Sequence, residues 1–191
     1  MLNLELKVKI DEMEEIRKII SNLSIYSNTF YQKDTYFLTG KKRVKIRESK
    51  NNNELIYYIR EDSISSKNSR YFLLKINNFI IFLIKKIFKT KVVIEKKRDL
   101  YIYKNTRIHL DEVKNLGNFL ELETVIKDGS KYKDYEIEHL KLIEHLNLNA
   151  MEKIKYSYSD LMMEDNINII TKQIGLKTSF SINIDYLKHL G

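Results

Sequence analysis

Two segments of this 191-residue chain carry charged side chains at every second position, a spacing that can build a chemical site. The first opens the chain and runs from Asn3 to Lys9 (NLELKVK), and the second ends with Glu121 and Glu123 around one leucine. Residues two apart share a face of a β-strand, so each segment predicts one charged face and one aliphatic face. Carboxylates beside lysines on the inside of a sheet suit a divalent metal ion bound to a polyphosphate.

Other segments repeat this alternation of charged and apolar residues. Two pairs of residues share a face in this way: Lys96 with Arg98, and Tyr58 with Arg60. Two triplets do the same: Arg43 with Lys45 and Arg47, and Arg107 with His109 and Asp111. A surface sheet explains any one such strand. Six strands of this kind favour a barrel with a charged interior and helices over its apolar outside. Such an interior needs counter-charges, an anion for the bases and a cation for the acids.

The positions of these strands predict an α+β fold, an antiparallel sheet of eight strands with helices outside. The expected strands are Leu2–Ile10, Asp34–Leu38, Arg43–Glu48, Glu54–Arg60, Tyr71–Ile76, Val92–Tyr103, Thr106–Leu110 and Phe119–Val125. The polar residues 50–53 and 104–105 predict hairpin turns between antiparallel strands.

Apolar residues at helical spacing predict three helices outside the sheet. These are Asp11–Leu23 with Asp11 as the N-cap, a helix from Asn77 or Asn78 to Lys89, and Tyr135–Leu146. The patterns weaken after Met163, so we expect one domain over residues 1–163 and an appendage of unknown role over residues 164–191.

The composition limits the kind of site and the compartment. The chain has no cysteine, which excludes disulfides and thiolate metal sites and favours hard ions on oxygen ligands. The net charge of +8 suits a nucleic-acid surface or a small polyanion. The N-terminus lacks the pattern of a signal peptide, and the apolar run Phe79–Ile84 is shorter than the roughly 20 residues that span a bilayer. We therefore expect a soluble cytoplasmic protein.

From Leu2 to about Leu161, the chain resembles the CYTH superfamily, the triphosphate tunnel metalloenzymes, and within it the class IV adenylyl cyclase-like branch. The opening strand resembles the family's ExExK motif with Asn3 in the first acidic slot, and Lys96-Lys97-Arg98 resembles its KxR strand. Other matching segments are 32–37, 43–47, 55–62 with Lys67, Ser69 and Tyr71, the stretch 107–123, and 158–161. Ser65-Ser66 replaces the usual Gly-Pro before Lys67. The order of these segments makes the resemblance specific.

The resemblance implies an eight-stranded closed antiparallel β-barrel whose tunnel holds a triphosphate and one or two divalent ions, Mg²⁺ or Mn²⁺. By position, Lys7 and Asp111 would be catalytic. The metal ligands would be Glu5, Glu121, Glu123 and Asp111. The substrate-binding cations would be Lys7, Lys45, Arg47, Arg60, Lys67, Lys96 and Arg98.

Three functions follow from this resemblance. The first is adenylyl cyclisation, ATP to cyclic AMP plus pyrophosphate; the second is hydrolysis of an inorganic or organic triphosphate by a metal-activated water. The third is a polyphosphate- or nucleotide-binding module without catalysis. A nucleic-acid-binding barrel is disfavoured, because inward carboxylates would repel a phosphate backbone. The expected partner is ATP or inorganic triphosphate, with no nucleic acid and no membrane; the oligomeric state stays open, with a homodimer as one option.

Overall fold

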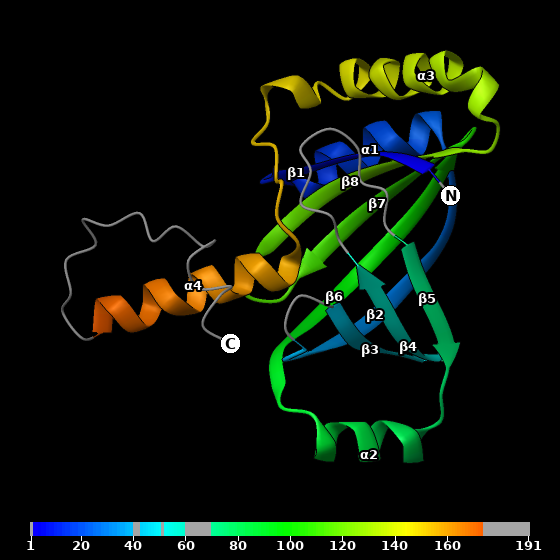
Figure 1. Ribbon diagram of the computed structural model, residues 1–191. Helices are drawn as coiled ribbons and strands as arrows, with labels where there is room; N and C mark the ends of the chain where they lie inside the picture. Colours follow the sequence, from blue (N-terminus) through cyan, green and yellow to red (C-terminus); the bar gives the residue numbers. More distant parts are fainter. Residues whose placement is uncertain (1, 40–42, 51, 60–69, 174–191) are drawn as a thin grey trace. The chain divides into compact units, whose positions relative to one another are not determined.

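The computed structural model describes residues 2–39, 43–50, 52–59 and 70–173 (Figure 1). The strands are β1 (Leu2–Ile10), β2 (Ile25–Phe37), β3 (Arg43–Ser49), β4 (Asn53–Ile59), β5 (Arg70–Lys75), β6 (Thr90–Tyr103), β7 (Thr106–Val113) and β8 (Gly117–Ile126). The helices are α1 (Met13–Leu23), α2 (Asn78–Ile87), α3 (Tyr132–His145) and α4 (Tyr158–Gln173), with short 3₁₀ turns at Gly129–Lys131 and Leu148–Ala150. The predicted α+β class is confirmed.

The strands form one sheet in the order β1-β8-β7-β6-β2-β3-β4-β5. Because β1 and β5 stand at the two ends of this order, the hydrogen-bonded ladder of the described residues does not close. The closed barrel expected from the resemblance is therefore not confirmed. Alternation along a strand specifies its faces, but closure depends on pairing between strands far apart in the chain, which alternation does not encode.

The chain divides into two compact units. The first comprises Met1–Gln32, Arg60–Arg70 and Glu95–Lys155, and the second comprises Lys33–Ile59, Tyr71–Ile94 and Tyr156–Gly191. The long strands β2 and β6 contribute residues to both. Each unit is described below by itself.

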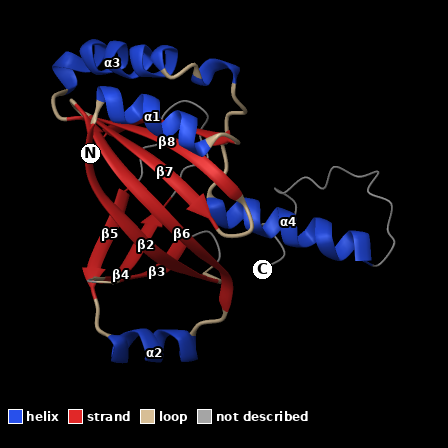
Figure 2. Ribbon diagram, turned by 180° about the vertical axis from the view of Figure 1, so that it is seen from behind, coloured by secondary structure: helices blue, strands red, loops and turns tan. Residues whose placement is uncertain are grey.

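The first unit has a core between the apolar face of its strands and two helices. Both ribbon views show α1 and α3 on the same side of β1, β7 and β8 (Figures 1 and 2). Full burial of a side chain such as Ile20 or Leu122 contributes roughly 1.5–3 kcal/mol. The buried members of this core are Val8, Ile10, Met13, Ile16, Ile20, Tyr101, Ile108, Leu110, Leu120, Leu122, Leu142, Ile143, Leu146 and Leu148. On β1 and β8 these residues alternate with Glu5, Lys7, Glu121 and Glu123, which therefore lie on the opposite face. On β6, Asp99 shares the core face with Tyr101 and pairs with Arg17 of α1.

Helix α1 buries Met13, Ile16 and Ile20, the spacing of one helical face. The N-cap is Glu12, without a side-chain capping bond, so the expected Asp11 cap is wrong by one residue. The acidic residues of the first turn still favour this end through the helix dipole.

Helix α3 is attached to the strands by a buried polar network. The Nδ1 of His139 lies 2.8 Å from the Oγ1 of Thr124, which lies 2.7 Å from the Oγ1 of Thr106. Glu138 accepts hydrogen bonds from the hydroxyl of Thr106 at 2.8 Å and from the backbone N–H of Asn105 at 3.0 Å. His139 is therefore a helix-packing residue.

In the second unit, β3 and β4 form the expected hairpin, with Glu48 opposite Asn53. Helix α2 begins where the Asn77 side chain accepts a hydrogen bond from the backbone N–H of Ile80 at 3.0 Å. Phe37, Ile46, Ile76 and Ile81 form the small core beneath it. Helix α4 continues through Met163, and residues 174–191 of the expected appendage lie outside the described part of the chain.

Candidate active site

The charged face of the first unit is aligned by the antiparallel register of β1, β8, β7 and β6. Residues directly opposite each other in adjacent strands share a face, so the register arranges these side chains in rows. The first row is Glu5, Glu123 and Arg107, the second is Lys7, Glu121 and His109, and the third contains Asp111 and Arg98.

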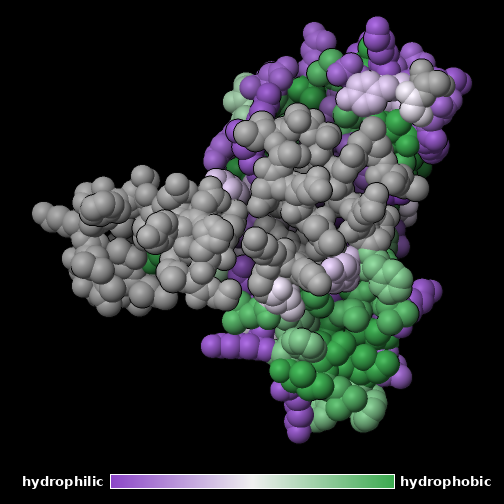
Figure 3. All heavy atoms as spheres, in the orientation of Figure 1, coloured by the Kyte–Doolittle hydropathy of each residue, from purple (hydrophilic) through white to green (hydrophobic). Residues whose placement is uncertain are grey.

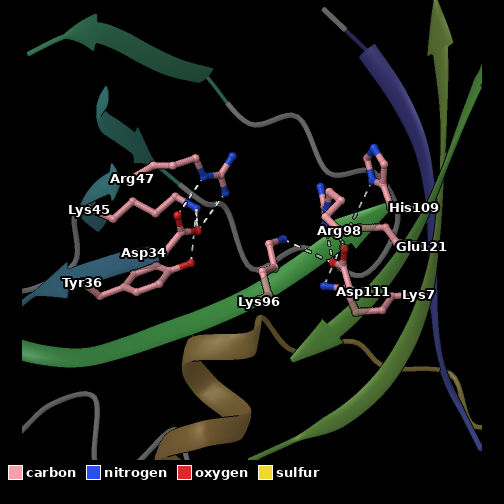
Figure 4. A network of polar contacts seen from close by, with 10 residues as sticks. All are labelled: Lys7, Asp34, Tyr36, Lys45, Arg47, Lys96, Arg98, His109, Asp111 and Glu121. Carbon is pink, nitrogen blue, oxygen red and sulfur yellow. Dashed lines mark hydrogen bonds and ion pairs between the residues drawn. The ribbon is translucent and has the colours of Figure 1, made fainter. Parts of the chain in front are cut away.

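Asp111 is the fully buried anchor of the third row. The Nε of Arg98 donates to its Oδ1 at 2.6 Å, and the Nη2 donates to its Oδ2 at 2.6 Å. The Nζ of Lys96 donates to Oδ2 at 3.2 Å (Figure 4). Burial opposes ionisation of Asp111, but the charges of Lys96 and Arg98 outweigh it and hold the pKa of this carboxyl below its ordinary value. Asp111 is thus ionised and fixes the direction of two cations.

Glu121 connects the second row to the third. Its Oε2 accepts a hydrogen bond from the Nη2 of Arg98 at 2.8 Å, and its Oε1 lies 3.7 Å from the Nζ of Lys7. Burial would raise the pKa of Glu121, but Lys7, His109 and Arg98 together lower it well below its usual range. A carboxylate held ionised at neutral pH can accept a metal ion or a further cation.

His109 lies on the same face, 3.7 Å from Glu121 through its Nδ1. Among the described residues, this buried nitrogen has no hydrogen-bond partner. Burial and the neighbouring Arg98 charge lower the pKa of His109 from 6.5, so the ring is neutral at neutral pH. The site predictions omitted His109, although its position two residues before Asp111 placed it on the same face.

The first row has the features of a cation site. Glu5 and Glu123 stand directly opposite each other, and like charges in that position destabilise a sheet unless cations lie near them, as Arg107 does beside Glu123. Glu123 accepts from the Asn3 Nδ2 at 2.7 Å and pairs with the Nη1 of Arg107 at 3.3 Å. The amide oxygen of Asn3 is buried and has no hydrogen-bond partner among the described residues. It is therefore available as a neutral oxygen ligand, although Asn3 breaks the acidic motif.

These donors fit a magnesium or manganese ion. Within residues 2–39, 43–50, 52–59 and 70–173, no three acidic or histidine side chains converge into a ready metal centre. Magnesium does not need such a cluster, because it binds through one or two carboxylates and keeps water or substrate oxygens as its other ligands. Glu5, Glu123 and the amide oxygen of Asn3 match that requirement.

The second unit holds a separate cluster built on Asp34. The Nε and Nη2 of Arg47 donate to the two Asp34 oxygens at 2.7 and 2.8 Å, and the Nζ of Lys45 donates at 2.7 Å (Figure 4). The Lys45 ammonium also lies 5.2 Å from the centre of the Tyr36 ring. Asp34 is buried, and the sequence analysis gave it no role. The feature that could have identified it is its position as a single acidic residue at the start of the buried part of β2, Asp34–Phe37.

The predicted site residues are therefore distributed as follows. The first unit brings together Glu5, Lys7, Lys96, Arg98, Asp111, Glu121 and Glu123 on one face of its strands. Lys45 and Arg47 meet at Asp34 in the second unit. Arg60 and Lys67 lie outside the described residues.

Known proteins resemble this chain over most of its length. A protein of Methanocaldococcus jannaschii named "putative adenylate cyclase" is 28% identical over 173 residues, covering 84% of this chain and 98% of that protein. A Pyrococcus horikoshii structure matches with a TM-score of 0.72 and 21% identity, covering 84% of this chain and 99% of the other. A Hippeastrum protein, described as a "putative adenylyl cyclase" with a dominant triphosphatase activity, matches with a TM-score of 0.62 and 12% identity over 86% and 95% of the chains.

A family profile described as "CYTH domain" matches residues 1–158 of this chain. This match covers most of the chain and all three rows of the charged face. The resemblance read from the sequence is confirmed, and the chain belongs to the CYTH domain family.

Proposed function

We propose that this protein is a divalent-metal-dependent enzyme that acts on the phosphorus of a triphosphate, with cyclisation of ATP as the first candidate reaction. The observation that supports it best is the face of the first unit, where carboxylates and cations alternate in register. Phosphoryl transfer is accelerated mainly by positioning the reacting groups and by neutralising the charge on the phosphate oxygens. A face of alternating carboxylates and cations can do both.

The charges on this face explain why substrate and metal would bind together. Four carboxylates stand beside five cations, so the face carries little net charge of its own. Such a face attracts a bare polyanion weakly. A metal–triphosphate complex offers a cation to the carboxylates and oxygens to the lysines and arginines. The residues concerned are Glu5, Asp111, Glu121 and Glu123 with Lys7, Lys9, Lys96, Arg98 and Arg107.

In this proposal, Glu5, Glu123 and the amide oxygen of Asn3 hold the metal, with Glu121 beside them. A bound Mg²⁺ or Mn²⁺ would supply positive charge to the phosphate oxygens in the transition state. Lys7 acts as a compact point charge toward a phosphate oxygen.

Asp111 has a different part in this proposal. Both of its oxygens are engaged by Arg98 and Lys96. We therefore propose that Asp111 orients these two cations toward phosphate, and its predicted metal contact stays a prediction.

Two reactions can use this arrangement. In cyclisation, the ribose 3′-oxygen forms a bond to the α-phosphorus while the bond to pyrophosphate breaks, and the hydroxyl proton is released. In hydrolysis, water attacks a phosphorus of the triphosphate and phosphate leaves. The triphosphatase activity ascribed to the Hippeastrum relative is the reason to keep hydrolysis as the second candidate. The enclosing barrel and the parts of Lys45, Arg47, Arg60 and Lys67 in binding stay predictions.

The decisive assay incubates the purified protein with ATP and, separately, with inorganic triphosphate, each with Mg²⁺ or Mn²⁺. We expect cyclic AMP and pyrophosphate from ATP. Phosphate release without a cyclic product would assign the protein to the triphosphatases. Tight triphosphate binding without either product would overturn the enzymatic proposal and leave a binding module.

We expect Glu123→Gln to abolish metal-dependent turnover while the protein stays folded, because the change removes one charge from the proposed metal ligands. The matched control is Glu112→Gln: Glu112 lies next to this face in sequence, but its side chain is 46% exposed and pairs with Lys97. Turnover and Mn²⁺ affinity should be measured together. Full activity in Glu123→Gln would remove this residue from the metal site.

A further inference from the structure

Seven of the ten residues of helix α2 are apolar, yet the helix is largely exposed. Of its ten residues, Asn78–Ile87, the sole buried one is Ile81. Phe79 is 67% exposed, Phe82 53% and Ile87 72%. An apolar helix face is normally buried against a core, a partner or a membrane, so the exposed apolar face of α2 has the composition of a contact surface.

The exposed apolar side chains form one continuous surface, which we call the α2 patch. It consists of Phe79, Ile80, Phe82, Leu83, Ile87 and Phe88. Residues three and four apart adjoin on a helix, so these side chains touch along its length. Figure 3 shows a broad hydrophobic area over α2 and the strands next to it. Contiguous apolar surfaces of this kind are rare on soluble monomers and mark interaction sites.

The charges around the α2 patch are mostly positive. From Lys75 to Ile94 the sequence has no aspartate or glutamate, and it has five lysines: Lys75, Lys85, Lys86, Lys89 and Lys91. One carboxylate, that of Glu48 on β3, pairs with Lys85 at 2.6 Å. Lys86 lies over the Phe82 ring at 4.8 Å, and Lys89 and Lys91 are exposed beside the end of the helix. Aromatic and aliphatic side chains beside lysines are the composition of helices that lie in the surface of an anionic bilayer.

We propose that the α2 patch docks this protein on an anionic phospholipid surface, with α2 lying in the plane of the bilayer. Ten helical residues extend only about 15 Å, half the hydrocarbon thickness. Consistent with this, none of the helices in the described ranges has the length and apolarity needed to cross a membrane. The expectation of no membrane partner rested on that length, which excludes crossing but not lying at the surface.

A second copy of the chain fits this surface less well. Symmetric pairing through α2 would bring together two segments whose own charged residues are all lysines, Lys75, Lys85, Lys86, Lys89 and Lys91. Like charges facing each other oppose association, whereas acidic lipid headgroups supply the missing anions. The charge around the patch therefore favours lipid.

The test is flotation of the full chain with vesicles of phosphatidylcholine, with and without phosphatidylglycerol. We expect binding to the anionic vesicles that weakens with salt, and little binding to phosphatidylcholine alone. The double variant Phe79→Ser/Phe82→Ser should lose at least tenfold in affinity. Lys89→Gln and Lys91→Gln should each cost roughly fivefold. Tyr31→Ser is the matched control, because Tyr31 is 65% exposed on β2, in the first unit.

Circular dichroism should show native secondary structure in every variant. The proposal is overturned if the wild-type protein stays unbound, or if the phenylalanine double variant binds as the wild type does. A concentration-dependent dimer that dissociates in this double variant, without vesicle binding, would assign the patch to a second copy instead. These outcomes do not depend on turnover, so they are separable from the triphosphate proposal.

Discussion

Two lysine–arginine pairs in this protein are held in the same way, each by one buried aspartate. In each case a lysine and an arginine two residues apart on one strand converge on a buried aspartate, and the arginine contacts both carboxylate oxygens. The two clusters are Lys96, Arg98 and Asp111, and Lys45, Arg47 and Asp34. An aspartate used in this way orients cations before an anion binds, which reduces the ordering cost of binding.

We expect Asp111→Asn to destabilise the protein strongly. The change removes the charge that the buried Lys96 and Arg98 share, although Arg98 keeps its ion pair with Glu121; removing one partner of a buried ion pair costs about 3–5 kcal/mol. Urea unfolding measures the loss. Glu95→Gln is the control, since its exposed pair with Lys114 should contribute no more than about 1 kcal/mol. A similar small loss in Asp111→Asn would show that the aspartate is not the anchor of this cluster.

The free energy of unfolding should decrease in two separate pH ranges as the pH is lowered. The folded-state pKa of His109 lies below 6.5, so from pH 6.5 downward the unfolded chain binds a proton first and stability decreases. The pKa values of Asp111 and Glu121 are lowered from 3.8 and 4.5, so their stabilisation is complete above those values and is lost as pH falls through the folded-state values.

Urea midpoints measured across pH would show both windows. In His109→Gln, the fall that begins near pH 6.5 should become shallower while the acidic window persists, with the buried His139 accounting for the remainder of the upper window. An unchanged upper window would mean that His109 is not buried as a neutral ring.

The carboxylate of Glu138 is one of the groups that attach helix α3 to the strands. Glu138 accepts hydrogen bonds from the backbone N–H of Asn105 and from the hydroxyl of Thr106. Glu138→Ala should therefore remove one hydrogen-bond partner of the buried Thr106 hydroxyl. We expect a loss of about 1–3 kcal/mol and faster hydrogen exchange across α3. Glu136→Ala, on the exposed side of the same helix, should change neither quantity. Equal effects of the two changes would contradict this account.

Among the elements, agreement between prediction and structure follows burial. Strand β1 has the predicted bounds, because its alternation separates a buried face from a charged one. Strand β2 begins at Ile25, well before the predicted Asp34. The prediction missed residues 25–33 because they are mostly exposed and their types carry no alternating pattern. Helix α4 was not among the three predicted helices, because the pattern after Met163 is weak. Its signal was a capping box: the Ser157 hydroxyl accepts from the Asp160 N–H at 3.3 Å, and the Asp160 carboxylate accepts from the Ser157 N–H at 3.3 Å.

For the molecule as a whole, binding of metal and triphosphate should be measurable as stabilisation. A ligand at 100 times its dissociation constant stabilises by about 2.7 kcal/mol, which raises the Tm of a chain of this size by roughly 5–10 °C. We expect Mn²⁺ and triphosphate together to raise the Tm more than the sum of their separate effects, because the charged face is nearly neutral alone.

Arg98→Ala should reduce the triphosphate part of this shift more than the Mn²⁺ part. Thermal unfolding with each ligand and with both measures the two contributions. If triphosphate without metal stabilised the wild-type protein as strongly as the pair, the argument from a self-neutralised face would be wrong.

Local pattern was sufficient for much of this protein. Period-two alternation identified which residues share a strand face, and the order of charged motifs identified the family, because both are properties of residues near one another in the chain. The pairing of Glu5 with Glu123, the burial of Asp111 and the exposure of α2 came from the folded structure. Each depends on which distant segment lies alongside or covers another, and neighbouring residue types do not encode that.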